Sequence, residues 1–185
     1  MPNKPQRRAS KDPIRIGTIS RLEKERKPWL FLDTFAQLNL IMKGKVHFFL
    51  GGEGSEWGKL QEYSRKLGIA PYLSMPGLVL TPTDFLKGLD LYITLNVEET
   101  TGISGLEAVF QGIPVIGIQL TPDYQPKTSD WIWSSQNPAN VAIKISELFE
   151  SLDILQDMAK SQFNVAISMY SVRNMRDRYL KIYAK

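Results

Sequence analysis

Residues 91–118 read LYITLNVEETTGISGLEAVFQGIPVIGI. This stretch begins and ends with short apolar runs, at 91–95 and 114–118, which predict two buried strands. Between them, residues 104–111 predict a short helix that Gly112 terminates. Two fully apolar strands with a helix between them indicate neighbouring parallel strands in a sheet that is covered on both faces.

The same alternation of apolar runs and amphipathic stretches extends over the chain from Ile14 onward. Further strands are predicted at 14–20, 46–50 and 73–75, the last before a turn at Pro76-Gly77, and further helices from Pro28, at 55–67, from Pro82 to Gly88 and from Pro138 to about Glu150. Helical segments follow to the end. The expected fold class is α/β, a Rossmann-like doubly wound parallel sheet with C-terminal helices.

Length and composition narrow the class of protein further. The 185 residues carry a net charge of +4, contain no cysteine and have one histidine. This composition excludes disulfides and thiolate chemistry and leaves little for a transition-metal site. No apolar run approaches the roughly 20 residues that cross a bilayer. We therefore expect a cytoplasmic protein, with possible peripheral contact at the inner membrane face.

Basic residues concentrate at the two ends of the chain, in a leader at 1–12 and in the last predicted helix. Such ends can contact nucleic acid or anionic lipid. No aromatic residues interleave with the charges of the leader, which argues against a nucleic-acid partner. We expect a flexible basic leader at 1–12.

The loop and helix that follow the strand at 91–95 suggest an anion site. Free N–H groups at a helix N-terminus attract anions, and Gly102 and Gly105 would let a phosphate approach the backbone closely. Glu99 and Glu107, eight residues apart, would flank that phosphate and accept hydrogen bonds from hydroxyls. A nucleoside diphosphate sugar has this layout: ribose hydroxyls, two phosphates, then sugar hydroxyls.

The same residues allow a purely structural interpretation. Ser104-Gly105-Leu106-Glu107 has the form of a capping box, in which Ser104 caps the helix and Glu107 reaches back. This interpretation does not account for the second carboxylate or for the glycine spacing. Both interpretations stay open from the sequence alone.

A basic pair, Arg21 and Lys27, lies in the loop between the first strand and the first helix. Ligands of doubly wound sheets bind beyond the carboxyl ends of the strands, where this loop is expected. Two fixed cations there could neutralise a diphosphate without a metal ion and stabilise the charge on a departing diphosphate. The alternative is a solvated run of charges.

Three weaker motifs point elsewhere. Residues 51–59 resemble a phosphate loop, but Glu53 stands inside the cradle and Leu60 follows the lysine, so we expect the glycines to let a loop pass close to a ligand or helix. His47 is a lone histidine in a strand and is expected to be packed and hydrogen-bonded. Residues 131–133 are expected to form a buried edge strand.

Taken together, these segments resemble the C-terminal, donor-binding domain of the family-4 retaining glycosyltransferases of GT-B fold. The resemblance covers nearly the whole chain from Ile14, and the pair of glutamates separated by seven residues, Glu99 and Glu107, is its most specific part. The matching pieces are Arg21-Leu22 with Lys27, Gly52-Glu53-Gly54, Met75-Pro76-Gly77, Asp90, 99–107 and Gly112-Ile113-Pro114-Val115-Ile116.

The resemblance implies a role for each candidate site residue. Glu107 would bind the ribose hydroxyls, Glu99 would contact the transferred sugar, and backbone near Gly77 would meet the base. Backbone amides around Gly102 and Ile103 would hold the diphosphate together with Arg21 and Lys27, for which Arg26 is the alternative. Arg21, Lys27 and Glu99 would be catalytic. No metal or cofactor is implied, and the expected donor is a UDP- or GDP-sugar.

The resemblance also implies a domain organisation. Residues 13–170 would be the donor-binding domain, and the helix at 171–185 would dock on an N-terminal, acceptor-binding domain that this chain lacks. The chain alone would bind donor but transfer little or no sugar. Two alternatives stay open: a non-catalytic nucleotide-sugar-binding module, and a sugar-nucleotide epimerase of GT-B type.

Overall fold

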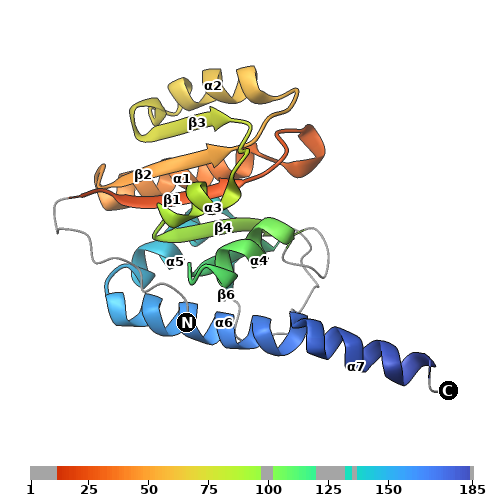
Figure 1. Ribbon diagram of the computed structural model, residues 1–185. Helices are drawn as coiled ribbons and strands as arrows, with labels where there is room; N and C mark the ends of the chain where they lie inside the picture. Colours follow the sequence, from red (N-terminus) through yellow and green to blue (C-terminus); the bar gives the residue numbers. More distant parts are fainter. Residues whose placement is uncertain (1–11, 97–101, 120–131, 135–136, 184–185) are drawn as a thin grey trace.

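The computed structural model describes residues 12–96, 102–119, 132–134 and 137–183. Residues 1–11 of the predicted leader and Glu99 lie outside these residues. Six parallel strands form one sheet in the order β3-β2-β1-β4-β5-β6 (Figure 1). The strands are β1 (Ile14–Ile19), β2 (Val46–Gly51), β3 (Leu73–Gly77), β4 (Leu91–Asn96), β5 (Val115–Gln119) and β6 (Ile132–Ser134). This strand order confirms the Rossmann-like fold class.

Helices cover both faces of the sheet. They are α1 (Trp29–Met42), α2 (Trp57–Lys66), α3 (Pro82–Lys87), α4 (Ile103–Phe110), α5 (Pro138–Leu148), α6 (Leu152–Tyr170) and α7 (Val172–Tyr183), with short 3-10 turns η1 (Lys24–Arg26) and η2 (Ala70–Tyr72). The helices pack on the sheet through two clusters of buried hydrophobic residues. Helices α1, α2 and α5 contribute to one cluster, and α3 and α4 contribute to the other. Because α6 contributes to both clusters, it joins the two layers.

Two of the predicted boundaries differ from the structure by two residues. The sequence ended the third strand at Met75, but β3 continues to Gly77 because it is an edge strand, where a proline without an N–H is tolerated. The second helix was predicted from Ser55 but begins at Trp57. Ser55 lies in the turn before the helix, where its N–H and hydroxyl both donate to the Glu23 carboxylate.

A buried side-chain amide attaches α6 to the sheet. Gln162 is fully buried; its Nε2 donates to the Val115 carbonyl at 2.7 Å, and its Oε1 accepts from the Val115 N–H at 2.8 Å. The side chain thus takes the place of a neighbouring strand at that point of β5. A fully satisfied buried amide of this kind holds α6 in one orientation on the sheet.

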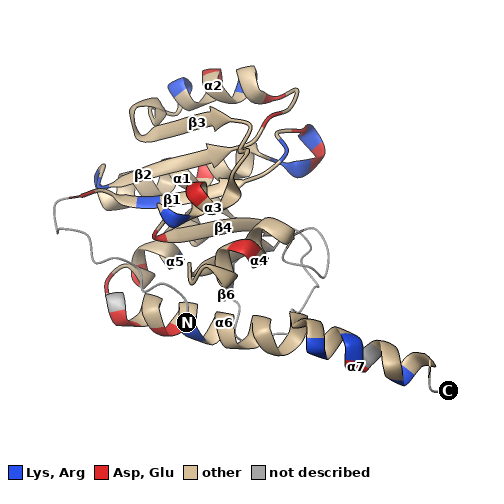
Figure 2. Ribbon diagram, viewed as in Figure 1, with Lys and Arg blue, Asp and Glu red and all other residues tan. Residues whose placement is uncertain are grey.

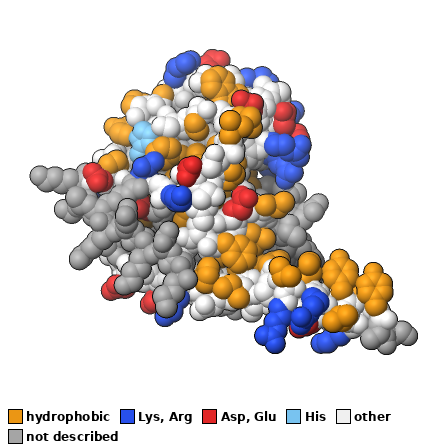
Figure 3. Space-filling model, in the orientation of Figure 1, with side chains coloured by type: hydrophobic (Ala, Val, Ile, Leu, Met, Phe, Trp, Pro, Cys, Tyr) orange, Lys and Arg blue, Asp and Glu red, His pale blue; other side chains and the backbone are white. Residues whose placement is uncertain are grey.

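The last helix extends away from the body of the molecule (Figure 1). It presents exposed apolar side chains, and Figure 3 shows them beside basic ones on this helix. The exposed apolar residues are Val172, Met175, Tyr179, Leu180, Ile182 and Tyr183. None of the helices in the described part of the chain has the length and apolar character to span a membrane.

Candidate functional site

The loops that follow the first three strands are joined by backbone hydrogen bonds into one rim at the carboxyl edge of the sheet. The Leu22 N–H donates to the Glu53 carbonyl at 2.9 Å, and the Gly52 N–H donates to the Gly77 carbonyl at 2.8 Å. The Glu53 carboxylate also accepts from the Leu78 N–H at 3.3 Å. The basic loop after β1 and the turn at Gly77 therefore belong to one hydrogen-bonded surface.

Two glycines of the β2 loop let the chains of this rim pass very close together. Gly52 has φ +123°, and a Cβ built on it would overlap the Ser20 carbonyl oxygen. A Cβ on Gly54 would overlap the Leu22 carbonyl. The glycines thus make room for the backbone of the β1 loop, rather than for a ligand or helix as the sequence suggested. Because the backbone of the β1 loop occupies the space beside Gly52 and Gly54, the β2 loop does not form a phosphate cradle.

The N-terminus of α4 opens on the same rim. Gly102 is its N-cap residue, with φ +73°, and in the described part of the chain no side chain caps the helix. The first N–H groups of a helix have no partner within it, so they are available to an anion. The Ser104 hydroxyl donates to the Ile19 carbonyl at 3.4 Å. This bond ties the tip of α4 to the last residue of β1.

The capping-box interpretation of Ser104 and Glu107 is therefore wrong. The helix begins at Ile103, so Ser104 lies inside its first turn instead of preceding it. Its hydroxyl faces β1 instead of a backbone N–H of its own helix. Glu107 is half-exposed one turn further on, and its negative charge contributes to raising the pKa of Tyr92, which burial raises most.

The predicted cations lie on the rim that the β1 loop forms. Arg21 follows Ile19 by two residues, and both Arg21 and Lys27 are exposed. Figure 2 shows basic and acidic residues close together in the loop between β1 and α1. Lys27 adopts the left-handed conformation, φ 46°, at the end of η1. Charge from Arg21 helps to lower the pKa of Glu23, although hydrogen bonds from Ser55 contribute more. The structure thus brings Arg21, Lys27, Gly77, Gly102, Ile103 and Glu107 to the same edge of the sheet.

The sequence did not point to Tyr92, a buried polar residue whose hydroxyl bonds to the last residue of β1. Tyr92 is fully buried, and its hydroxyl accepts from the Ile19 N–H at 3.1 Å and donates to the Ile19 carbonyl at 3.2 Å. Thr18 is also buried there. The available signal was a tyrosine inside an otherwise apolar strand, since a buried tyrosine hydroxyl needs a partner.

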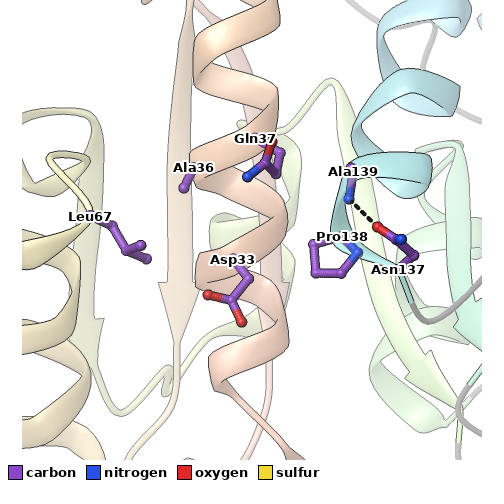
Figure 4. A pocket seen from close by; sticks show the side chains of 7 residues that line it. All are labelled: Asp33, Ala36, Gln37, Leu67, Asn137, Pro138 and Ala139. Carbon is purple, nitrogen blue, oxygen red and sulfur yellow. Dashed lines mark hydrogen bonds between the residues drawn. The ribbon is translucent and has the colours of Figure 1, made fainter.

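A separate pocket of about 290 Å³ lies between α1, the end of α2 and the start of α5 (Figure 4). It shares no residue with the predicted site. Its lining is Asp33, Ala36, Gln37, Leu67, Asn137, Pro138 and Ala139. The charged residue in this lining is an aspartate, which repels phosphate, so the pocket does not suit a nucleoside diphosphate.

His47 is packed and hydrogen-bonded, as the sequence predicted. Its Nε2 lies 2.8 Å from the Ser74 hydroxyl, and its ring lies against Phe49 with centroids 4.9 Å apart. Burial lowers the pKa of His47, and the charge of Arg15 lowers it further. The histidine is thus held neutral in the folded protein to a lower pH than in the unfolded chain.

This pKa shift predicts a pH dependence of stability. Below the ordinary histidine pKa of about 6.5, the unfolded chain takes up a proton that folded His47 resists, so the free energy of unfolding falls as pH decreases and levels off below the folded pKa. Urea unfolding between about pH 7.5 and 5.5 would measure this slope. His47→Gln, which removes the chain's one histidine, should flatten it. An unchanged slope in that variant would contradict the assignment.

Comparisons with known proteins agree on one family and one fold. The family model for Glycosyl transferases group 1 matches residues 13–151. The poly(ribitol-phosphate) alpha-N-acetylglucosaminyltransferase of Staphylococcus aureus (strain COL) is 21% identical over 172 residues, which cover 91% of this chain and 35% of that protein. The chain thus spans about a third of the length of this curated relative.

Solved structures show the same fold. A mutant of S. aureus TarM, in complex with fondaparinux, alpha-GlcNAc-glycerol and UDP, aligns with a TM-score of 0.76 and 19% identity over 98% of this chain and 38% of that chain. The C-terminal domain of a glycosyl transferase group 1 family protein (LpcC) from Francisella tularensis aligns with a TM-score of 0.71 and 16% identity, over 88% of this chain and 89% of that one.

Proposed function

Because the chain belongs to the glycosyl transferases group 1 family and has the fold of one half of a GT-B enzyme, we propose that it is a donor-binding domain. The enzyme would be a retaining, metal-independent glycosyltransferase of family-4 type. It would transfer a sugar from a nucleotide-diphospho-sugar to an acceptor. The LpcC domain, which this chain covers almost completely, supports assignment to the C-terminal half of such an enzyme.

One observation carries the proposal: the tip of α4 and the basic loop meet at the end of β1. The Ser104 hydroxyl bonds to the Ile19 carbonyl, and Arg21 follows two residues later. Strand order reverses between β1 and β4, and doubly wound sheets bind ligands at the crevice above such a point. Free helix N–H groups and a guanidinium on one crevice are the groups that hold a diphosphate.

The proposed roles are those that the resemblance to the family-4 glycosyltransferases implies. Amides at Gly102 and Ile103 would hold the diphosphate with Arg21 and Lys27, Glu107 would accept hydrogen bonds from the ribose, and backbone at Gly77 would meet the base. Glu99 would contact the sugar. During transfer the bond between the sugar and the diphosphate breaks, and fixed cations stabilise the charge left on the diphosphate in the transition state. Those cations are the reason for proposing that no metal is needed.

The rest of the enzyme would be a second domain that binds the acceptor. The chain spans about a third of the S. aureus relative, which leaves room for such a domain. The exposed apolar side chains of α7 would pack on it, since an apolar helix face of this kind is stable when covered. By itself the chain would bind donor and transfer little or no sugar.

Calorimetric titration of the chain with UDP-, GDP- and ADP-sugars tests the proposal, with UDP as the first choice because the TarM mutant holds UDP. We expect one nucleotide class to bind. Glu107→Ala should weaken that binding about tenfold to a hundredfold, because a hydrogen bond to a charged group contributes about 1.5–3 kcal/mol. The control is Glu62→Ala, which removes an exposed carboxylate that pairs with Lys66 on α2. Failure of the wild type to bind any of the three classes would refute the proposal.

A further inference from the structure

β1 pairs unequally with its two neighbours. With β2 it pairs along its whole length, from Ile14↔Val46 to Ile19↔Gly51. With β4 the recorded pairs are Ile16↔Leu91 and Gly17↔Tyr92. The final residue of β1, Ile19, therefore has no backbone partner in β4. The two strands separate at their carboxyl ends, at the point where the strand order reverses.

The hydroxyl of Tyr92 takes the place of the missing backbone partner. It accepts from the Ile19 N–H at 3.1 Å and donates to the Ile19 carbonyl at 3.2 Å. The ring reaches this position from two residues lower in the sheet, because Tyr92 is level with Gly17 in the register. The tyrosine is fully buried, so both polar groups of Ile19 are satisfied without water.

The same carbonyl of Ile19 also accepts from the Ser104 hydroxyl at 3.4 Å. One backbone group thus connects the start of the basic loop to the first turn of α4. Tyr92 contacts both elements: its hydroxyl bonds to Ile19, and its ring packs in the same buried cluster as Ala108 and Val109 of α4.

We propose that Tyr92 is a positioning residue, which sets the distance between the Arg21 loop and the tip of α4 so that both reach one diphosphate. This inference rests on the proposed function. Tyr92 does not touch the ligand in this arrangement; it acts through Ile19 and Ser104. A hydrogen bond between strands would draw β1 and β4 together, whereas the tyrosine hydroxyl satisfies Ile19 while the strands remain apart.

Tyr92→Phe tests the inference because it keeps the ring in the core and removes only the hydroxyl. The matched control is Tyr63→Phe, which removes a hydroxyl that donates to Asp33 Oδ1 at 2.7 Å between α2 and α1. Each variant is titrated with the nucleoside diphosphate that the wild type binds, among UDP, GDP and ADP, and with the corresponding monophosphate. Thermal unfolding is measured in parallel.

We expect Tyr92→Phe to bind the diphosphate about tenfold more weakly, a change of about 1.4 kcal/mol, and the monophosphate less than about twofold more weakly. Tyr63→Phe should bind both as the wild type does, although both variants lower the melting temperature. Should Tyr92→Phe not fold, Ser104→Ala is expected to show the same selective loss.

Three results would overturn the inference. Wild-type affinity for the diphosphate in Tyr92→Phe, or in Ser104→Ala where that variant replaces it, would show that the hydroxyl positions nothing. An equal loss of diphosphate and monophosphate binding would show a merely structural role. Absence of nucleotide binding by the wild type would refute the proposed function and this inference with it, whereas the first two results leave the proposed function intact.

Discussion

Alanine in place of Arg21 is expected to weaken binding of the nucleoside diphosphate about tenfold to a hundredfold, which corresponds to about 1.5–3 kcal/mol. The guanidinium lies on the exposed loop that follows β1, at the edge where the N-terminus of α4 opens. A guanidinium can donate two parallel hydrogen bonds to a phosphate, and alanine removes both. Titration calorimetry with the diphosphate measures the change.

The control for this experiment is Lys45→Ala. Lys45 is also exposed, but it precedes β2 and therefore lies at the opposite edge of the sheet. Both variants lower the net charge by one, so a difference between them reports position and not overall charge. Arg21→Lys should recover only part of the affinity, because an ammonium lacks the planar fork. Equal affinities in the two alanine variants would contradict a role for Arg21 in binding the diphosphate.

Alanine in place of Gly52 is expected to destabilise the protein by about 3 kcal/mol or more, which is beyond the effect of most single substitutions. Gly52 has φ +123°, a conformation that residues with a side chain rarely adopt, and its Cβ would overlap the Ser20 carbonyl oxygen. The obstacle is backbone, so it cannot move aside as a flexible side chain would. Urea unfolding monitored by circular dichroism measures the loss.

Gly58→Ala provides the matched control. Gly58 lies in α2, and a Cβ built on it meets no atom within 4 Å. Alanine there should stabilise the helix by about 0.5–1 kcal/mol. The two substitutions make the same chemical change six residues apart and should have opposite signs. A Gly52→Ala variant as stable as the wild type would show that the β1 and β2 loops are not packed as described.

Much of the fold could be predicted because its signals are local. The strands β1, β2, β4 and β5 consist mostly of apolar residues, and mostly apolar runs of this length are typical of strands buried on both faces. Proline at the first turn of α3 and of α5 marked where those helices start. The predicted starts and ends were wrong in places, as at Ser55, which lies before α2 and bonds to Glu23, 32 residues away.

For the site, the sequence supplied residue types and the order in which they follow strands. It could therefore place Arg21, Lys27, Gly77, Gly102, Ile103 and Glu107 on one edge, since carboxyl ends of parallel strands meet there. It could not distinguish a capping box from an anion site at Ser104. The capping box is excluded by a contact with Ile19, 85 residues earlier in the chain, whose carbonyl accepts the hydroxyl of Ser104; the anion site stays a prediction.

The sequence by itself determined the fold class, the edge of the sheet where the candidate site lies and the residue types available there, because hydrophobic periodicity and glycine or proline signals act over a few neighbouring residues. Only the tertiary structure decided that β1 and β4 separate above Gly17, that Tyr92 fills the gap between them and that Gly52 accommodates the backbone of Ser20. These features join residues more than 30 positions apart. They arise from packing and from the need to satisfy buried backbone groups, which no local pattern encodes.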